Sequence, residues 1–279
     1  MTPMLRLLAH RGFVLGLALC AVFIGMALLS LLWTPYAPNA IAIPQKLQTP
    51  SLLHWLGTDQ LGRDTLSRIM VGARTSVAVG VVAVAIGLVL GVPLGLWAAA
   101  RRGWTDEVLG RAVDLTFAFP AVLSAILITA LLGPGAVNAI LAIGIFNIAV
   151  FARVSRGAAL VVYGRDFVRA AQSLGRSRLD IALRHVLPNM ANALIVQATI
   201  QFAIAILAEA ALGYLGLGTQ PPQASWGKML LDAQTLLAQA PLQAVFPGVA
   251  IAVAVLGLNL IGDGLRDLLD PRMKVGRIG

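Results

Sequence analysis

Two glutamines, Gln197 and Gln201, lie four residues apart in an otherwise apolar stretch of the chain. In a helix this spacing places both amides on one face, where each offers hydrogen-bond donors and acceptors. Such a face could bind a polar solute weakly, as a translocation path requires, and Asn147 in another apolar stretch could contribute to the same path. Hydrogen bonds between neighbouring helices are the alternative use of these three amides.

The sequence shows no pattern typical of catalysis or nucleotide binding. Gly227-Lys228 is followed by Met229 and lacks the upstream glycine of a phosphate-binding loop. The three histidines lie far apart, and neither H-E-x-x-H nor G-x-S-x-G occurs. A single cysteine, Cys20, excludes a cysteine-based metal cluster. We therefore expect no catalytic residue, metal ligand or cofactor-binding residue on this chain.

The overall composition is that of a membrane protein. Of the 279 residues, 58% are apolar and 12% are charged, with a mean hydropathy of +0.85. A soluble domain carries about twice that share of charged residues, and a disordered chain combines high charge with low hydrophobicity. The net charge of +9 comes from basic residues between apolar stretches, so we expect no nucleic-acid partner. The polar residues must be positioned by helices in a lipid bilayer.

The apolar stretches predict an all-α polytopic membrane protein with six transmembrane helices. A bilayer core needs about 20 apolar residues per helix, and the uncharged stretch 115–152 is too long for one crossing. Gly133, Pro134 and Gly135 in its middle predict a turn between two helices. The expected spans are residues 13–33, 76–99, 113–132, 136–155, 191–213 and 242–262.

The basic residues outside these spans predict the orientation of the chain. With both termini in the cytoplasm, sixteen of the 21 lysine and arginine residues fall on the cytoplasmic side and five outside. The lipid bilayer is therefore an expected partner along the whole core. The expected parts are a tail with the first span (1–34), an outer segment (35–74), a core of five spans (75–270) with a cytoplasmic loop (157–189) and an outer loop (214–241), and a cytoplasmic tail (271–279).

The longest cytoplasmic loop contains two predicted short helices. Asp166 can cap the first helix, and Gly175 can end it in the conformation typical of a helix C-terminus. Ser177 can cap the second, and Pro188 marks the step into the fifth span. The loop is either an amphipathic hairpin that anchors the bundle or a docking element for a cytoplasmic partner.

Four motifs carry a resemblance to a known family. RAAQSLG (169–175), followed by Arg184 and HVLP, resembles the loop motif of binding-protein-dependent ABC importer permeases. Three further stretches narrow the resemblance to the dipeptide/oligopeptide/nickel permease family, over residues 50–274. These are HWLGTDQLGRDTLSRIMVGAR (54–74), EAALGYLGLGTQPPQASWGKML (209–230) and GDGLRDLLDPRMK (262–274).

The resemblance implies a permease subunit of an ATP-driven importer, with a type I ABC importer bundle, in the inner membrane of a prokaryote. Its partners would be a second homologous permease, two cytoplasmic ABC ATPase domains that bind ATP and Mg²⁺, and an extracytoplasmic solute-binding protein. Di- and oligopeptides are the favoured solutes, with nickel complexes and glutathione also open. An ATP-independent secondary transporter or channel is the alternative, although no charge is expected at mid-bilayer.

In such permeases a short helix of the cytoplasmic loop enters a groove on the ATPase. The family motif begins with Glu where this chain has Arg169, which inverts one charge at the docking surface. The small residues of the motif are retained. The residues implied in ATPase coupling are Phe167, Arg169, Ala170, Ala171, Leu174 and Gly175.

A polar motif in the outer segment, GTDQLGRD (57–64), is expected to act as a scaffold or outer gate. Asp59, Arg63 and Asp64 are spaced for local ion pairs, and the apolar residues around them predict an amphipathic helix. That helix would lie on the outer membrane surface or support the docked binding protein. Glu209, at the outer end of the fifth span, would lie near the same gate.

The second span carries three glycines at intervals of four, Gly87, Gly91 and Gly95. A repeated G-x-x-x-G allows two helices to approach closely. These glycines would pack against another span or against the partner permease, and Pro93 is expected to kink the helix.

Overall fold

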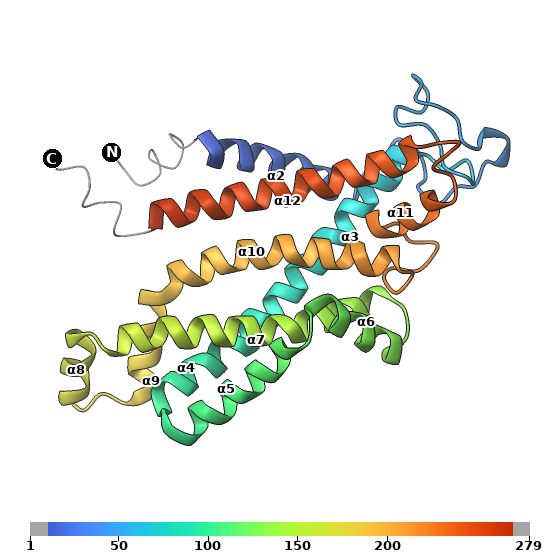
Figure 1. The fold of residues 1–279 in the computed structure, drawn as a ribbon. Coiled ribbons are helices and arrows are strands. Elements are labelled where there is room, and N and C mark those ends of the chain that lie inside the picture. The colour runs from blue at the N-terminus through green and yellow to red at the C-terminus, as the bar shows by residue number, and fades with distance from the viewer. Residues whose placement is uncertain (1–10, 270–279) are drawn as a thin grey trace.

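The computed structural model describes residues 11–269 as a bundle of long helices (Figure 1). Lipid offers no hydrogen-bond partners, so the apolar stretches satisfy their backbone groups within helices. Extended pairing in the described range is limited to one bridge, between Thr58 and Asp64. The predicted all-α fold is confirmed. Its elements are α2 (Arg11–Leu29), η1 (Ile43–Gln45), α3 (Thr65–Ile86), η2 (Gly87–Gly91), α4 (Val92–Arg101), α5 (Gly103–Ala118), α6 (Ala121–Leu132), α7 (Ala136–Tyr163), α8 (Asp166–Ser173), α9 (Arg178–Ile181), η3 (Ala182–Val186), α10 (Leu187–Tyr214), α11 (Trp226–Gln234) and α12 (Leu242–Leu269).

Within residues 11–269, five helical stretches are long and apolar enough to cross a bilayer. Three are the single helices α2, α7 and α12, and two are composite. The elements α3, η2 and α4 run on without a break over Thr65–Arg101, and α9, η3 and α10 do so over Arg178–Tyr214. With α5 and α6 taken as one bent span, the total is the predicted six.

The third span departs from the expected straight helix over 113–132. The structure breaks it between α5 and α6, whose axes differ by 87°. Pro120 lacks an N–H and excludes the residue before it from helical geometry, and Phe119 is accordingly extended, with φ −104° and ψ 136°. The helix before the break begins well ahead of the predicted start, at Gly103.

Two prolines inside the spans are accommodated by π-helical turns. The turn η2 ends two residues before Pro93, and η3 ends two residues before Pro188. A proline ring clashes with the carbonyl four residues earlier in an α-helix, and a wider π turn at that point relieves the clash. Pro188 lies in the first turn of α10, where the sequence predicts the entry into the fifth span, although α9, η3 and α10 follow one another as one helical stretch.

The three glycines of the second span lie against α7 of the same chain. A Cβ at Gly87 would come within 2.6 Å of the Phe151 ring, and one at Gly91 would meet the Ile148 carbonyl oxygen. A Cβ at Gly95 would overlap the Ser155 hydroxyl. This close approach fixes α4 and η2 on α7.

The GTDQLGRD motif forms a tight loop, which corrects the expectation of an amphipathic helix there. Gly57 and Gly62 adopt positive φ values of 72° and 74°, a region that a regular helix does not use. A Cβ at Gly62 would overlap the backbone of Ala42, so the loop is closed against the preceding segment. The helix begins only at Thr65, with Asp64 as its cap.

The two ends of the bundle are occupied by different elements. Figure 1 places α8, the start of α2 and the end of α12 at one end, which we call the α8 end. The segment between α2 and α3 and the helix α11 lie at the opposite end, the α11 end. The candidate sites fall at these two ends and in the core between them.

Candidate functional site

The short helix α8 is held firmly on one side by the bundle. Val168 and Ala171 are buried, at 0% and 7% exposure, in an apolar cluster with residues of α7 and η3 such as Val162 and Val186. Among the small residues of the motif, Ala171 therefore faces its own bundle, whereas Ala170 is exposed. The helix is thus fixed in orientation by its inner side.

The outer side of α8, which faces away from the helix bundle, is exposed and lacks strong contacts within the chain. Phe167 is 41% exposed and Leu174 is 82% exposed. Arg169 donates to the Gly164 carbonyl oxygen at 3.1 Å and lies 3.9 Å from the Asp166 carboxylate. Exposed pairs of this kind contribute little to stability. The exposed side can meet a partner at little cost in internal contacts.

The ends of α8 and α9 are capped largely as the sequence predicts. Gly175 has φ +75°, and the Arg176 N–H donates to the Ala171 carbonyl oxygen at 3.2 Å, which closes the last turn of α8. Ser177 caps α9 by accepting from the Asp180 N–H at 3.2 Å. The predicted cap by Asp166 is wrong, because Arg165 takes the N-cap position without a side-chain bond.

The amides predicted to line a path lie in the core, where two of them bond to each other. The Gln201 amide donates to the Asn147 side-chain oxygen at 3.2 Å, and the Asn147 amide donates to the Ala83 carbonyl oxygen at 3.1 Å. Both side chains are buried, at 3% and 2% exposure. They join α10, α7 and α3, and Gln197 is half-buried one turn away.

At the α11 end, Asp59 organises the GTDQLGRD loop. Its carboxylate accepts from the Leu61 and Arg63 N–H groups at 2.9 Å each and from the Arg63 guanidinium at 2.6 Å. Arg68 from α3 adds a further charge 3.5 Å away. Both arginines are buried, and Arg63 also reaches Asp232 of α11 at 3.9 Å. The predicted local ion pairs are present, joined by one from α11.

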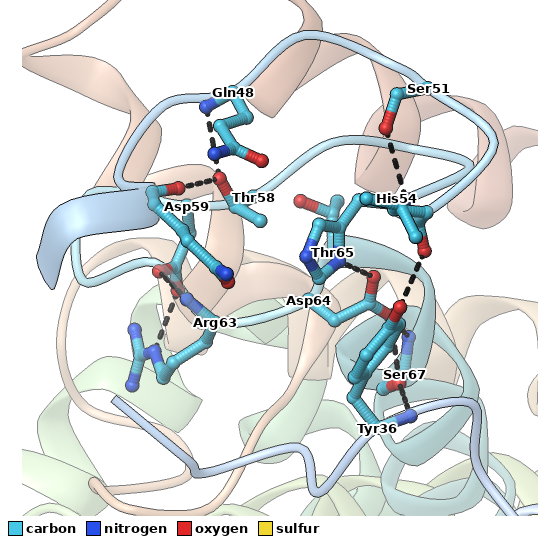
Figure 2. A network of polar contacts seen from close by, with 12 residues as sticks. Tyr36, Gln48, Ser51, His54, Thr58, Asp59, Arg63, Asp64, Thr65 and Ser67 are labelled. Carbon is cyan, nitrogen blue, oxygen red and sulfur yellow. Dashed lines mark hydrogen bonds and ion pairs between the residues drawn. The ribbon is translucent and has the colours of Figure 1, made fainter. Parts of the chain in front are cut away.

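Asp64 bonds to a different set of residues, shown in Figure 2. One carboxylate oxygen caps α3 by accepting from the N–H and hydroxyl of Ser67, at 2.8 and 2.7 Å. The other lies 2.9 Å from the His54 ring nitrogen Nδ1. The Tyr36 ring stacks on His54 with 4.5 Å between centroids. The network ties both halves of the outer segment to the start of α3.

Glu209 lies apart from this network, between α3 and the start of α11. It is 1% exposed and accepts from the Ser76 hydroxyl at 3.0 Å. Nearby, the Trp226 indole donates to the Ile69 carbonyl oxygen at 3.1 Å and packs on Gly72. The carboxylate therefore ties α10 to α3, next to the contact by which Trp226 holds α11 on α3.

Comparison with known proteins gives the family. A family model described as "binding-protein-dependent transport system inner membrane component" matches residues 91–275. The chain belongs to this family. It is 44% identical to the dipeptide transport system permease protein DppC of Alkalihalophilus pseudofirmus, over 96% of this chain and 88% of that protein. It is 42% identical to the glutathione transport system permease protein GsiD of Pectobacterium atrosepticum, over 86% and 80%.

A solved structure shares the fold of this permease-family chain. The inward-facing MetNI methionine ABC transporter superposes with a TM-score of 0.61, over 71% of this chain and 95% of that one, at 18% identity. At that identity the likeness concerns the fold alone. The type I permease bundle expected from the sequence is confirmed.

One feature of this permease was missed from the sequence, a charged cavity between α4, α5 and α7. It measures about 450 Å³. Arg156 of α7 forms a bidentate pair with Asp106 of α5, and Arg153 pairs with Asp114 beside the Phe117 ring. No residue of α5 is buried. These pairs, which join residues 39 and 50 positions apart, hold α5 beside the cavity.

Proposed function

We propose that this chain is the membrane-spanning permease subunit of an ATP-driven importer of short peptides. It would pair with a second permease, two cytoplasmic ATPase domains and an extracytoplasmic solute-binding protein, and would carry no catalytic group of its own. Two relatives named for a dipeptide and for glutathione support this substrate class, since both solutes contain peptide bonds.

The observation that carries the proposal is the construction of α8. Its inner side is packed on α7 and η3, and its outer side presents Phe167, Ala170 and Leu174 to the surroundings. A force on that side would therefore reach both α7, on which α8 packs, and α10, to which α8 is linked through α9 and η3. This is the arrangement expected of a helix that transmits motion from an ATPase.

The proposed orientation puts the α8 end in the cytoplasm. The arginine-rich loop and the described ends of α2 and α12 all lie at that end in Figure 1, in agreement with an excess of basic residues inside. The α11 end would then face the solute-binding protein.

In the proposed cycle, movement of α8 rocks one helix bundle against that of the partner permease. The Asn147–Gln201 bond would keep α3, α7 and α10 moving as one body. Gln197, half-buried on α10, would offer its amide to the peptide backbone once the path opens. Weak, reversible hydrogen bonds suit a solute that must leave again.

A pair of matched substitutions tests this function. Leu174→Asp places a charge on the exposed side of α8, and Leu237→Asp places one on a 51%-exposed leucine at the α11 end. We expect Leu174→Asp to abolish co-purification of the ATPase and ATP-dependent uptake of a labelled dipeptide. Leu237→Asp should retain the ATPase.

Two results would contradict the proposal. One is an undiminished yield of ATPase with Leu174→Asp, measured at equal permease content in the membrane. The other is uptake by the permease alone in proteoliposomes under an ion gradient without ATP, which would identify a secondary transporter.

A further inference from the structure

An exposed apolar tip projects from the outer segment. Leu52 is 96% exposed, Leu53 is 75% exposed and Trp55 is 66% exposed, although none of them lies in a helix. From Leu47 to Thr58 the chain carries no aspartate, glutamate, lysine or arginine. Large apolar side chains gathered on one short loop require a partner surface of matching character.

The backbone of this tip is fixed by hydrogen bonds. The Ser51 and Gly57 N–H groups both donate to the His54 carbonyl oxygen, at 2.8 and 2.9 Å. The His54 N–H donates to the Ser51 hydroxyl at 3.1 Å, and its ring is buried against Asp64. The histidine ring points toward Asp64 and is buried (Figure 2), whereas its neighbours Leu53 and Trp55 are exposed. Little entropy is left to lose when the tip binds.

The tip is tied to the level at which the first span ends. The Tyr36 hydroxyl donates to the Leu53 carbonyl oxygen at 2.8 Å, and Tyr36 follows Trp33 by three residues. Trp33, just past the end of α2, is 55% exposed, and Leu32 beside it is 90% exposed. A tryptophan at a span end is typical of the membrane–water interface. The tip is therefore tied, through Tyr36, to the segment that directly follows α2.

We propose that Leu52, Leu53 and Trp55 insert into the lipid headgroup region of the outer leaflet beside the first span. The absence of charge in the tip, the pairing of leucines with a tryptophan and the continuity with the outer end of α2 all favour lipid over a protein partner. The inserted tip would hold the outer segment, and with it the cap of α3, at a fixed height above the bilayer. The assignment to the outer leaflet rests on the proposed orientation; the contact with lipid does not.

Spin labels on the assembled importer in lipid nanodiscs test the proposal. In a Cys20→Ala background, one label replaces Leu53 and a control label replaces Lys46, an exposed residue directly after η1. We expect the label at position 53 to collide with oxygen several-fold more than with a water-soluble nickel chelate, and the label at position 46 to show the reverse. Equal access of the chelate to both positions would overturn the proposal.

A second measurement keeps the native side chains. Brominated lipids quench tryptophans at the interface, so the quenched fraction of the protein's fluorescence should fall when Trp55→Phe is introduced. An unchanged fraction would overturn the insertion. If the chelate reaches position 53 until the solute-binding protein is added, the tip belongs to that protein and the proposal is wrong. None of these readouts depends on transport or ATP hydrolysis.

Discussion

The two ends of this permease place their charged residues in opposite surroundings. At the α11 end, Arg63, Asp64 and Arg68 are buried at 8%, 3% and 2% exposure, each within a bonded network. At the α8 end, the side chains of Arg169 and Asp166 are 69% and 100% exposed, with 3.9 Å between their charged groups. The same residue types thus form a closed structure at one end and an open surface at the other.

This difference shows at which end the charged side chains find their partners within the chain. A buried polar network is costly unless every member is bonded, and when it is bonded it specifies one shape. The segment between α2 and α3 needs such a network because its longest helix is η1. The α8 surface needs none, because its shape comes from Val168 and Ala171 packed beneath it. Its charges remain available to a second protein.

Two aspartates at helix starts provide the strongest test of this contrast. Asp64→Ala removes the cap of α3 and the partner of buried His54, and should lower the free energy of unfolding by about 3 kcal/mol. Asp166→Ala, at the exposed start of α8, should leave it unchanged within the error of the measurement. Denaturant titrations in detergent micelles measure both. Equal losses would show that burial does not separate the two ends.

Gly175 offers an intermediate effect, at the α8 end. Its φ of +75° strains any side chain, whereas the space around it is open. Gly175→Val should therefore cost about 1–2 kcal/mol locally and uncouple ATP hydrolysis from uptake, while the chain still inserts. Gly175→Asn, which tolerates this conformation, should keep most of the coupling. Solute-stimulated ATPase activity distinguishes them, and normal uptake by the valine variant would remove the coupling role.

The sequence predicts those features that depend on neighbours along the chain. The turn at Gly133–Gly135, the cap by Ser177 and the Asp59–Arg63 pair are all confirmed, because each is decided within a few residues. The bend at Pro120 had the same kind of local signal and was missed, since the apolar stretch around it is long enough to suggest one straight span. The clue in the sequence is Pro120 itself, because a proline disfavours helical geometry at the residue before it.

Contacts between distant segments could not be predicted in the same way. Gln201 and Asn147 are separated by 54 positions, and each amide alone suits either a path or a helix contact. The spacing of Asp64 and Ser67 is that of a helix cap, but nothing in the sequence pairs Asp64 with His54, ten positions earlier. Their meeting depends on how the outer segment folds back, which the tertiary packing decides. The α5–α7 ion pairs were missed for the same reason.

The ion pair between Asp106 of α5 and Arg156 of α7 is intermediate in burial, and its removal should have the smallest effect on stability. Arg156 and Asp106 are 39% and 19% exposed, between the buried pairs at the α11 end and the open α8 surface. In a double-mutant cycle, Asp106→Asn and Arg156→Gln should show a coupling energy of about 1 kcal/mol. The matched cycle on Glu107 and Arg111, exposed at 58% and 78%, should give about 0.3 kcal/mol. Thermal unfolding of the purified permease measures both cycles. If the exposed pair gave the larger coupling energy, the strength of ion pairs in this molecule would not increase with their burial.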